Sequence, residues 1–233
     1  MEWFEELDFD ENPFDTNPMR FSTKMVGVEE VMDELLYRVA SGAMVFIEAK
    51  GGCGKTSLLW NIIRRHRGKG RVIYVDCEKL EKDLNIEELL TKRFGLAGLL
   101  FKKKPKNMIL LLDNISELSR RNMERIKFFF DEGYILSVVY TGTGYDEIKF
   151  SKSLRDRIGR RVIRLKELEP YHAISLVRNR IGNSEMISDE LIEALFTRSG
   201  GNPKVLLENL DALFAKMVES KKDKLTKEDL RLV

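Results

Sequence analysis

The segment 49–56 constrains the fold of this chain more than any other part of the sequence. It reads Ala-Lys-Gly-Gly-Cys-Gly-Lys-Thr, and it follows the apolar run 43–47 and precedes the helix-like segment 57–63. A strand, a glycine-rich turn and a helix in this order are the setting of a phosphate-binding loop. The pattern G-x-x-x-x-G-K-[ST] is met except at its first position, where Ala49 stands in place of glycine. A methyl group there would be strained only if the backbone required a positive φ.

The residue types of this loop suit the binding of a nucleoside triphosphate. Glycines let successive backbone N–H groups approach phosphate oxygens closely, and the following helix adds the positive end of its dipole. Lys55 is long enough to reach the β- and γ-phosphates, and Thr56 offers a hydroxyl to Mg²⁺. The expected cofactors are therefore ATP and Mg²⁺. The predicted nucleotide-binding residues are Lys50, Gly51, Gly52, Cys53, Gly54, Lys55, Thr56 and Ser57.

Composition limits the class of protein. With 233 residues, of which 43% are hydrophobic, the chain can bury a sizeable core as one large domain or two small ones. No apolar run reaches the roughly 18 residues of a membrane span, and the acidic start of the chain is unlike a signal peptide. Two cysteines, Cys53 and Cys77, do not make a disulfide framework, so we expect a cytoplasmic location without membrane association. Because the net charge is only +2, contact with DNA would need a local basic patch.

Apolar runs and amphipathic segments alternate through the first two thirds of the chain. Continuous apolar runs are typical of strands in a parallel sheet, whereas apolar residues at helical spacing mark the segments between them. This alternation predicts a P-loop NTPase fold of the α/β class, with a parallel sheet as the middle of three layers. The predicted strands are 43–47, 71–77, 108–112, 135–140 and 162–165, and the predicted helices are 28–39, 57–63, 86–94 and 120–130.

After Pro170 the pattern becomes wholly helical. Ser188 is a predicted N-cap, and Asn202 with Pro203 forms the cap and first turn of a long helix. The segment 226–229 resembles a capping box that opens a short last helix. The predicted helices of this part are 171–181, 189–197 and 203–219. We therefore expect an N-terminal arm at 1–26, a nucleotide-binding α/β base at 27–167 and a small all-α lid at 168–233.

The N-terminal arm is aromatic, acidic and punctuated by proline, which is typical of an extended segment with turns. Its large apolar side chains need a surface to cover. They could dock on another protein or pack on the chain's own base, and packing on the base is the favoured interpretation. The aromatic residues concerned are Trp3, Phe4, Phe9 and Phe14.

A metal-binding acid is predicted at the end of the strand 108–112. Asp113 follows this strand directly, and ligands of open α/β sheets bind outside the carboxyl ends of the strands. We expect Asp113 to hold Mg²⁺ together with Thr56. A hydrolytic ATPase of this layout places glutamate next, to polarise the attacking water, but the residue here is Asn114. Because an amide cannot accept a proton, we predict slow or partner-stimulated hydrolysis, with Glu117 as the candidate substitute.

Several further segments resemble the AAA+ ATPases, the extended family of ring-forming P-loop motors and switches. The segment 26–30 is similar to the motif that packs near the adenine in that family. The resemblance implies that Thr143, with Thr141 as second choice, is the polar residue that reads the γ-phosphate. Lys204, in the segment 199–204, stands where the lid of this family places an arginine that touches the γ-phosphate. Lysine lacks the bidentate fork of arginine, so nucleotide-driven closure of the lid is expected to be weaker.

The segment 154–159, Leu-Arg-Asp-Arg-Ile-Gly, is similar to a segment of the Holliday-junction branch-migration motors. In that family an arginine at this place enters the site of the neighbouring subunit as a finger. The resemblance therefore implies self-association through Arg155 or Arg157. In the alternative interpretation both arginines are ordinary surface charges.

Within the AAA+ ATPases, the chain looks most like the replication-initiator clade, the origin-recognition-like proteins, and the related transposition regulators. Asp76, after a strand, would match the polar switch residue that those proteins place near the metal-site acid. Two departures weaken the match: initiators carry a winged-helix domain after the lid, which this sequence lacks, and an extra helical insertion before the metal-binding strand. The apolar segment 94–101 is either a reduced insertion or the continuation of a core helix, and the second interpretation is favoured.

Together these features predict an ATP-binding AAA+ ATPase that acts as a nucleotide-dependent assembly switch in a DNA transaction such as replication, recombination or repair. A protein partner is also expected. One alternative is an ATP-dependent scaffold or signalling module that does not bind DNA, and another is a nucleotide-binding remnant with a structural role. The basic run 102–106 is interpreted as a solvated loop rather than a nucleic-acid contact, so DNA binding stays open.

Overall fold

The computed structural model describes residues 2–66, 71–80, 84–92 and 106–233. The segment 94–101 and most of the basic run 102–106 lie outside the described residues, so the alternatives for them are not resolved. The chain forms two compact units, one made of residues 1–28, 52–57 and 166–233 and the other of residues 29–51 and 58–165.

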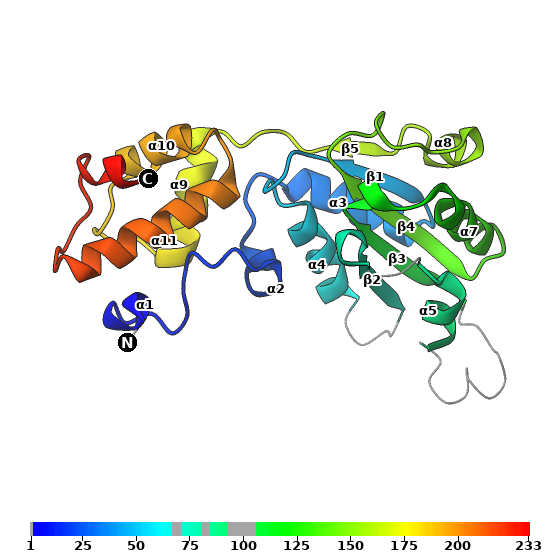
Figure 1. Cartoon of the computed structure of the whole chain (residues 1–233), viewed down its shortest axis with the longest axis horizontal. Coiled ribbons are helices and arrows are strands. Elements are labelled where there is room, and N and C mark those ends of the chain that lie inside the picture. The colour runs from blue at the N-terminus through cyan, green and yellow to red at the C-terminus, as the bar shows by residue number, and fades with distance from the viewer. Residues whose placement is uncertain (1, 67–70, 81–83, 93–105) are drawn as a thin grey trace. The chain divides into compact units, whose positions relative to one another are not determined.

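A five-stranded sheet forms the centre of the second unit (Figure 1). Every pairing in it is parallel, and the strand order is β2-β3-β4-β1-β5. The strands are β1 (Met44–Glu48), β2 (Val72–Asp76), β3 (Met108–Asp113), β4 (Ile135–Gly142) and β5 (Val162–Arg164). All five predicted strands are therefore confirmed, and the fold is the predicted P-loop NTPase sheet.

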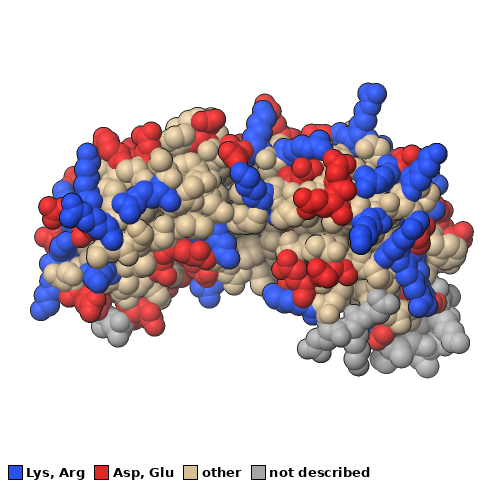
Figure 2. All heavy atoms as spheres, turned by 45° about the horizontal axis from the view of Figure 1, so that its top comes forward, with Lys and Arg blue, Asp and Glu red and all other residues tan. Residues whose placement is uncertain are grey.

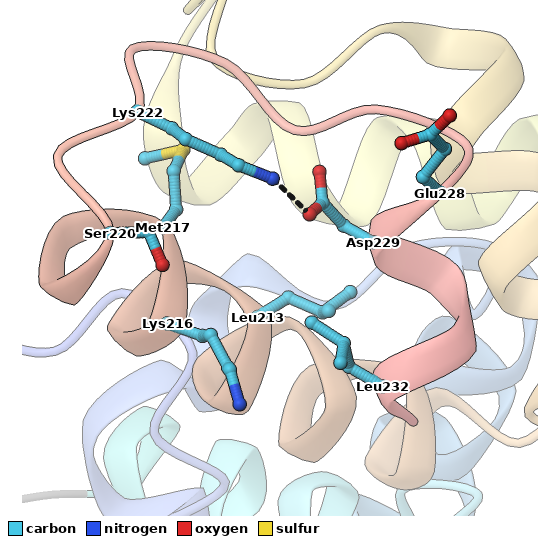
Figure 3. A pocket seen from close by; sticks show the side chains of 8 residues that line it. All are labelled: Leu213, Lys216, Met217, Ser220, Lys222, Glu228, Asp229 and Leu232. Atoms are coloured by element: carbon cyan, nitrogen blue, oxygen red, sulfur yellow. Dashed lines mark hydrogen bonds and ion pairs between the residues drawn. The ribbon is translucent and has the colours of Figure 1, made fainter.

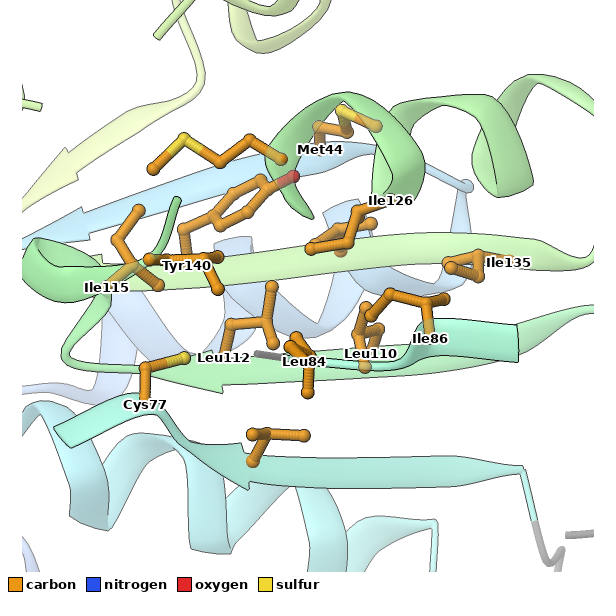
Figure 4. Packing of buried hydrophobic residues seen from close by; sticks show 14 of the residues in the cluster. Met44, Cys77, Leu84, Ile86, Leu110, Leu112, Ile115, Ile126, Ile135 and Tyr140 are labelled. Atoms are coloured by element: carbon orange, nitrogen blue, oxygen red, sulfur yellow. The ribbon is translucent and has the colours of Figure 1, made fainter. Parts of the chain in front are cut away.

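Helices cover both faces of this sheet. One face carries a large apolar cluster, in which Leu110, Leu112 and Tyr140 pack against α7 (Arg120–Asp131) (Figure 4). Because strand residues alternate between faces, the intervening residues point to the other side. That side is covered by α3 (Glu29–Ala40) and α4 (Lys55–Arg65), which place fully buried leucine, isoleucine and valine side chains in the core. The other α-helices among the described residues of this region are α5 (Ile86–Lys92) and α8 (Lys152–Ile158).

Among these helices α8 was not expected, because its segment was interpreted as a motif rather than as an element. Ser151 caps its first turn by accepting a hydrogen bond from the backbone N–H of Leu154 at 3.2 Å. Leu154 and Ile158 are buried on one side of the helix, four residues apart. The segment is only seven residues long, so its amphipathic pattern is too short to stand out from the sequence.

The first unit contains the helices α9 (Pro170–Ile181), α10 (Asp189–Arg198) and α11 (Pro203–Glu219), which confirm the three predicted helices. The predicted caps are also confirmed. Ser188 accepts from the N–H of Leu191, and Asn202 accepts from the N–H of Lys204 at 3.0 Å. The predicted short last helix is present as a 3₁₀ helix at Asp229–Leu232. There Asp229 accepts from both the backbone N–H and the hydroxyl of Thr226.

The N-terminal arm packs on these helices, so the expectation that it would lie on the α/β base is wrong. The arm forms two short helices, α1 (Trp3–Glu6) and α2 (Pro18–Phe21). Phe14 is 1% exposed, with its ring centroid 4.8 Å from that of Phe214 in α11. Trp3 stacks on Phe14 and donates its indole N–H to Asp211 at 2.8 Å. The apolar face of α11 is thus completed by a segment about 200 residues away in sequence, which local patterns do not encode.

Arg180 of α9 fastens the arm at a second point. Its guanidinium donates to the carbonyl oxygens of Pro13 and Asp15 at 2.9 and 2.8 Å and lies 4.0 Å from the ring centroid of Phe21. Burial lowers the pKa of Arg180 to about 10, although Asp15 and Glu11 oppose the shift. In the part of the chain that the structure describes, none of the helices combines the length and apolar character needed to cross a bilayer.

Candidate functional site

The phosphate-binding loop runs from the end of β1 at Glu48 to the first residue of α4 at Lys55. Gly52 and Gly54 have φ values of 78° and 89°, in the left-handed region that favours glycine. Ala49 is not among the residues with positive φ, and its N–H donates to the carbonyl oxygen of Gly142 in β4 at 3.2 Å. The alanine in place of the first glycine is therefore unstrained, and the loop keeps the backbone geometry that a phosphate cradle needs.

The side chains of the loop differ in burial. Lys55, the first residue of α4, is 6% exposed, which is unusual for lysine. Thr56, Ser57 and Cys53 are half-buried. Lys50, by contrast, is exposed.

Within the first unit, Gly52 lies directly against the start of α11. A Cβ atom at Gly52 would stand 2.5 Å from Oδ1 of Asn202 and 2.9 Å from Cβ of Lys204. At Gly51 a Cβ atom would meet nothing within 4 Å. Gly52 is thus required both by its φ and by this close approach, whereas Gly51 is required by neither. The ammonium group of Lys204 lies 3.6 Å from Glu208, one turn along α11.

Asp113 is the most buried of the predicted site residues, at 1% exposure. Residues of β3 alternate, and Leu110 and Leu112 belong to the apolar cluster, so Asp113 faces the side of the sheet that carries α4. Its Oδ1 accepts the hydroxyl of Thr141 at 2.5 Å, and its Oδ2 accepts the hydroxyl of Tyr74 at 3.0 Å. A buried carboxylate is tolerated here because both of its oxygens are hydrogen-bonded.

The negative charge of Asp113 affects the pKa values of two nearby side chains, Tyr74 in β2 and Cys77 directly after it. The pKa of Tyr74 is raised well above its ordinary value by burial and by the negative charge of Asp113. The pKa of the buried Cys77 thiol is raised to about 12 by burial and by the charges of Asp113 and Asp76. Both groups therefore stay protonated at neutral pH, and Tyr74 acts as a hydrogen-bond donor.

The residue types predicted to hold Mg²⁺ suit this ion. The ion prefers hard oxygen ligands and is commonly held by one or two carboxylates together with waters and substrate phosphates. Asp113 supplies a carboxylate and Thr56 a hydroxyl. Among the described residues, no group of three or more His, Cys, Asp or Glu side chains converges as a metal cage. Asp113 and Thr56 thus suit a cation whose other ligands are phosphate oxygens and waters.

The residues after Asp113 are held less firmly. Asn114 is half-buried in the left-handed conformation, with φ 53° and ψ 65°, which asparagine tolerates better than most residues. Its N–H donates to the Thr141 hydroxyl at 2.9 Å. Glu117, at the end of the 3₁₀ turn Ile115–Glu117, is exposed.

The two threonines considered as γ-phosphate readers lie in different environments. Thr141 is fully buried within β4 and contacts Asp113. Thr143 follows the end of β4 and is exposed. The structure therefore brings Thr141 to the acid rather than the first-choice Thr143. Tyr74 was missed altogether, although the alternation of β2 places it on the same face as Asp76 and could have drawn attention to it.

The two candidate finger residues both have partners within the α/β unit. Arg155 donates to the carbonyl oxygen of Ile148 at 3.0 Å and lies over the ring of Tyr145, 5.2 Å from its centroid. Arg157 is more exposed and forms an ion pair with Asp131 at 2.9 Å. An arginine that reaches a neighbouring subunit would have to leave these partners, and Arg157 has the weaker restraint because exposed ion pairs contribute little.

Other surface features stand apart from these residues. Basic and acidic side chains are interspersed on the face shown in Figure 2, in keeping with the low net charge. A hollow of about 270 Å³ lies between the end of α11 and the last 3₁₀ helix, where Lys222 and Asp229 form an ion pair at 2.6 Å (Figure 3). None of the predicted site residues lines this hollow, whose lining is Leu213, Lys216, Met217, Ser220, Lys222, Glu228, Asp229 and Leu232.

Comparison with known proteins agrees with this picture of the fold. A sequence profile of the family described as AAA domain matches residues 43–171, which is more than half of the 233 residues. A search of curated proteins finds no significant match. Among solved structures, Cdc6p from Pyrobaculum aerophilum is similar with a TM-score of 0.75 at 14% identity, over 96% of this chain and 70% of that protein.

Two further structures are similar at comparable levels. The Orc1 protein of Aeropyrum pernix, solved in complex with DNA, has a TM-score of 0.69 at 16% identity, over 88% of this chain and 64% of that one. The RuvB Holliday junction branch migration motor of Thermotoga maritima has a TM-score of 0.63 at 17% identity, over 88% of this chain and 67% of that one. The chain thus spans about two thirds of these proteins, and at such low identity the likeness concerns the fold alone.

Proposed function

Since the chain belongs to the AAA domain family of P-loop ATPases, we propose that it binds ATP with Mg²⁺ and uses the bound nucleotide to switch its assembly in a DNA transaction. The observation that carries the proposal is the pairing of an unstrained phosphate loop with a deeply buried, doubly hydrogen-bonded Asp113. Asp113 lies at the carboxyl end of β3, and ligands of open α/β sheets bind outside the carboxyl ends of the strands.

In this proposal the phosphate loop binds the phosphates of ATP, and Asp113 positions the metal ion. Backbone N–H groups of the loop and the ammonium group of Lys55 hold the β- and γ-phosphates. Thr56 and Asp113 would hold Mg²⁺, which would neutralise charge on the phosphates. Asn114 can orient a water molecule through hydrogen bonds but cannot take its proton. Turnover by the purified protein is therefore expected to stay below about 1 s⁻¹, the low end for phosphoryl transfer.

The assembly switch is proposed to act through the lid, residues 168–233, and through a neighbouring subunit. Lys204 supplies positive charge from the first turn of α11, and Arg157 or Arg155 supplies the finger from α8. Sedimentation with ATP, ADP and no nucleotide tests this step. A larger species in ATP alone supports the switch, and identical sedimentation in all three conditions contradicts it.

DNA as the substrate is supported by the segment 149–166, in which basic residues outnumber acidic ones despite the balanced composition of the whole chain. Its basic residues are Lys149, Lys152, Arg155, Arg157, Arg160, Arg161, Arg164 and Lys166. Binding to duplex DNA across a salt series tests the proposal, because phosphate contacts make log K fall steeply with log salt. Absence of binding at low salt with ATP would instead favour an ATP-dependent protein scaffold, which the mixed charge of the visible face would suit.

A further inference from the structure

We propose that Tyr74 is a positioning residue that fixes the carboxylate of Asp113 in the orientation that binds Mg²⁺. This inference rests on the proposed function, in which Asp113 holds the metal. It adds a residue that neither the phosphate-loop pattern nor the strand-end acid identifies. Tyr74 would act through Asp113 and would not touch the nucleotide.

The carboxylate of Asp113 is held from two sides by hydroxyl groups of neighbouring strands. Thr141 of β4 donates to Oδ1 at 2.5 Å, and Tyr74 of β2 donates to Oδ2 at 3.0 Å. Strand β3 lies between β2 and β4 in the sheet, so the two donors approach from opposite flanks. Each carboxylate oxygen therefore accepts a hydrogen bond from a different neighbouring strand, and the two bonds together oppose rotation of the carboxylate.

The ring of Tyr74 is itself fixed by the helix that follows the phosphate loop. Its centroid lies 5.5 Å from that of Trp60, and the two planes are inclined by 42°. Trp60 belongs to α4, the helix that begins at Lys55 and Thr56. Contacts therefore run from α4 through Trp60 and Tyr74 to Asp113.

The hydroxyl group of Tyr74 should raise the affinity of the site for Mg²⁺. Mg²⁺ demands near-ideal octahedral geometry, so it tolerates a rotated carboxylate poorly. Groups that orient a metal ligand through hydrogen bonds typically contribute 10–100-fold to metal affinity. Tyr74→Phe keeps the ring and its contact with Trp60 but removes the hydroxyl, so it isolates the hydrogen bond to Asp113.

Calorimetry measures the affinity for ATP in the presence of Mg²⁺ and again in the presence of EDTA. The ratio of these two affinities is the metal-dependent gain in ATP affinity. In Tyr74→Phe we expect this gain to fall about tenfold while the affinity in EDTA stays unchanged. Binding of Mn²⁺ in the presence of ATP, followed by electron paramagnetic resonance, gives a second readout that does not depend on turnover. Tyr134→Phe is the matched control, because Tyr134 packs against Phe129 at the other end of β4 and should leave the gain unchanged.

Fluorescence adds a readout of the Trp60 contact. In a Trp3→Phe background Trp60 is the sole tryptophan, because the chain contains two. Its emission in Tyr74→Phe should match the parent protein without ligand and should respond to ATP only at higher Mg²⁺ concentration. A spectrum already altered without ligand would show that the substitution disturbs packing, which would overturn the inference.

Two control variants separate this inference from the function beneath it. Asp113→Ala should remove most of the metal-dependent gain, and Lys55→Ala should remove ATP binding itself. An unchanged gain in Tyr74→Phe beside a lost gain in Asp113→Ala would overturn the role of Tyr74 and leave the proposed function standing. Unchanged ATP binding in both control variants would overturn the proposed function.

Discussion

The residues proposed to bind nucleotide and metal are held differently from those proposed to sense and hydrolyse it. Lys55 and Asp113 are 6% and 1% exposed, and Asp113 has a hydrogen-bond donor on each oxygen. Glu117 and Lys204, in contrast, are exposed. Buried and bonded side chains have little freedom to move, whereas exposed ones take the position that their surroundings offer.

From this difference we infer that the fold preorganises the residues proposed to bind ATP and Mg²⁺ more completely than those proposed to hydrolyse ATP. The sheet orients Asp113 from neighbouring strands before any ligand arrives, so little ordering free energy has to be supplied on binding. The candidate finger arginines are instead occupied by partners of their own, such as the Arg157–Asp131 ion pair at 2.9 Å. Hydrolysis in this protein should therefore depend on a conformational or assembly step more than binding does.

The largest expected effect comes from the buried lysine of the loop. Lys55→Ala should weaken ATP binding by at least about 100-fold, or ~2.7 kcal/mol, because it removes the buried lysine expected to pair with the β- and γ-phosphates. Calorimetry with ATP and Mg²⁺ measures this. The exposed neighbour provides the control, since Lys50→Ala should stay within about twofold of the parent protein. Equal losses of ATP affinity in both variants would contradict the different roles assigned to the buried Lys55 and the exposed Lys50.

A somewhat smaller loss is expected from the glycine that lies against α11. Gly52→Ala should weaken ATP binding by about 10-fold or more, because the new methyl group meets Asn202 and the backbone has a φ of 78°. Gly51→Ala meets nothing within 4 Å and should bind ATP normally. Chemical denaturation of both variants shows whether stability changes in parallel. If Gly51→Ala proved the more damaging of the two, the geometry assigned to the loop would be wrong.

Introducing a general base at position 114 tests whether its absence is what limits ATP hydrolysis. Asn114→Glu places a carboxylate next to Asp113 and should raise steady-state ATP turnover about tenfold, less than the roughly 10²–10⁴-fold that general-base catalysis typically contributes. The left-handed backbone at this position, with φ 53°, opposes the gain because glutamate tolerates it less well than asparagine. Asn114→Gln has the same size without a base and should not raise turnover. A similar increase in both variants would rule out proton transfer as the cause.

The smallest effect concerns the two thiols. Cys53 is half-buried in the phosphate loop, whereas Cys77 is buried with a pKa raised to about 12. Because the thiolate is the reactive form, iodoacetamide at pH 8 should modify Cys53 first. ATP with Mg²⁺ should slow this reaction, and mass spectrometry of peptides follows it. Faster labelling of Cys77, or labelling of Cys53 that ignores ATP, would contradict the proposed position of the nucleotide.

Local patterns in the sequence determined the elements of the fold. Continuous apolar runs such as 108–112 and 135–140 predicted the parallel strands, and the side chains of Ser188 and Asn202 predicted the starts of α10 and α11. The phosphate loop was identified by its glycines and its place between a strand and a helix. These predictions succeed because strand character, helix caps and glycine turns depend on residues within a few positions of one another.

The contacts between distant residues could be known only from the folded chain. Tyr74 and Thr141 reach Asp113 across 39 and 28 residues of sequence, and Trp3 reaches Asp211 across 208. The arm therefore covers α11 rather than the sheet, and Thr141 rather than Thr143 joins the acid. Strand order and the packing of one element on another determine these contacts, and the spacing of residues along the chain predicts neither. The sequence by itself determined that a phosphate loop and a strand-end acid exist, while the fold decided how firmly each is held.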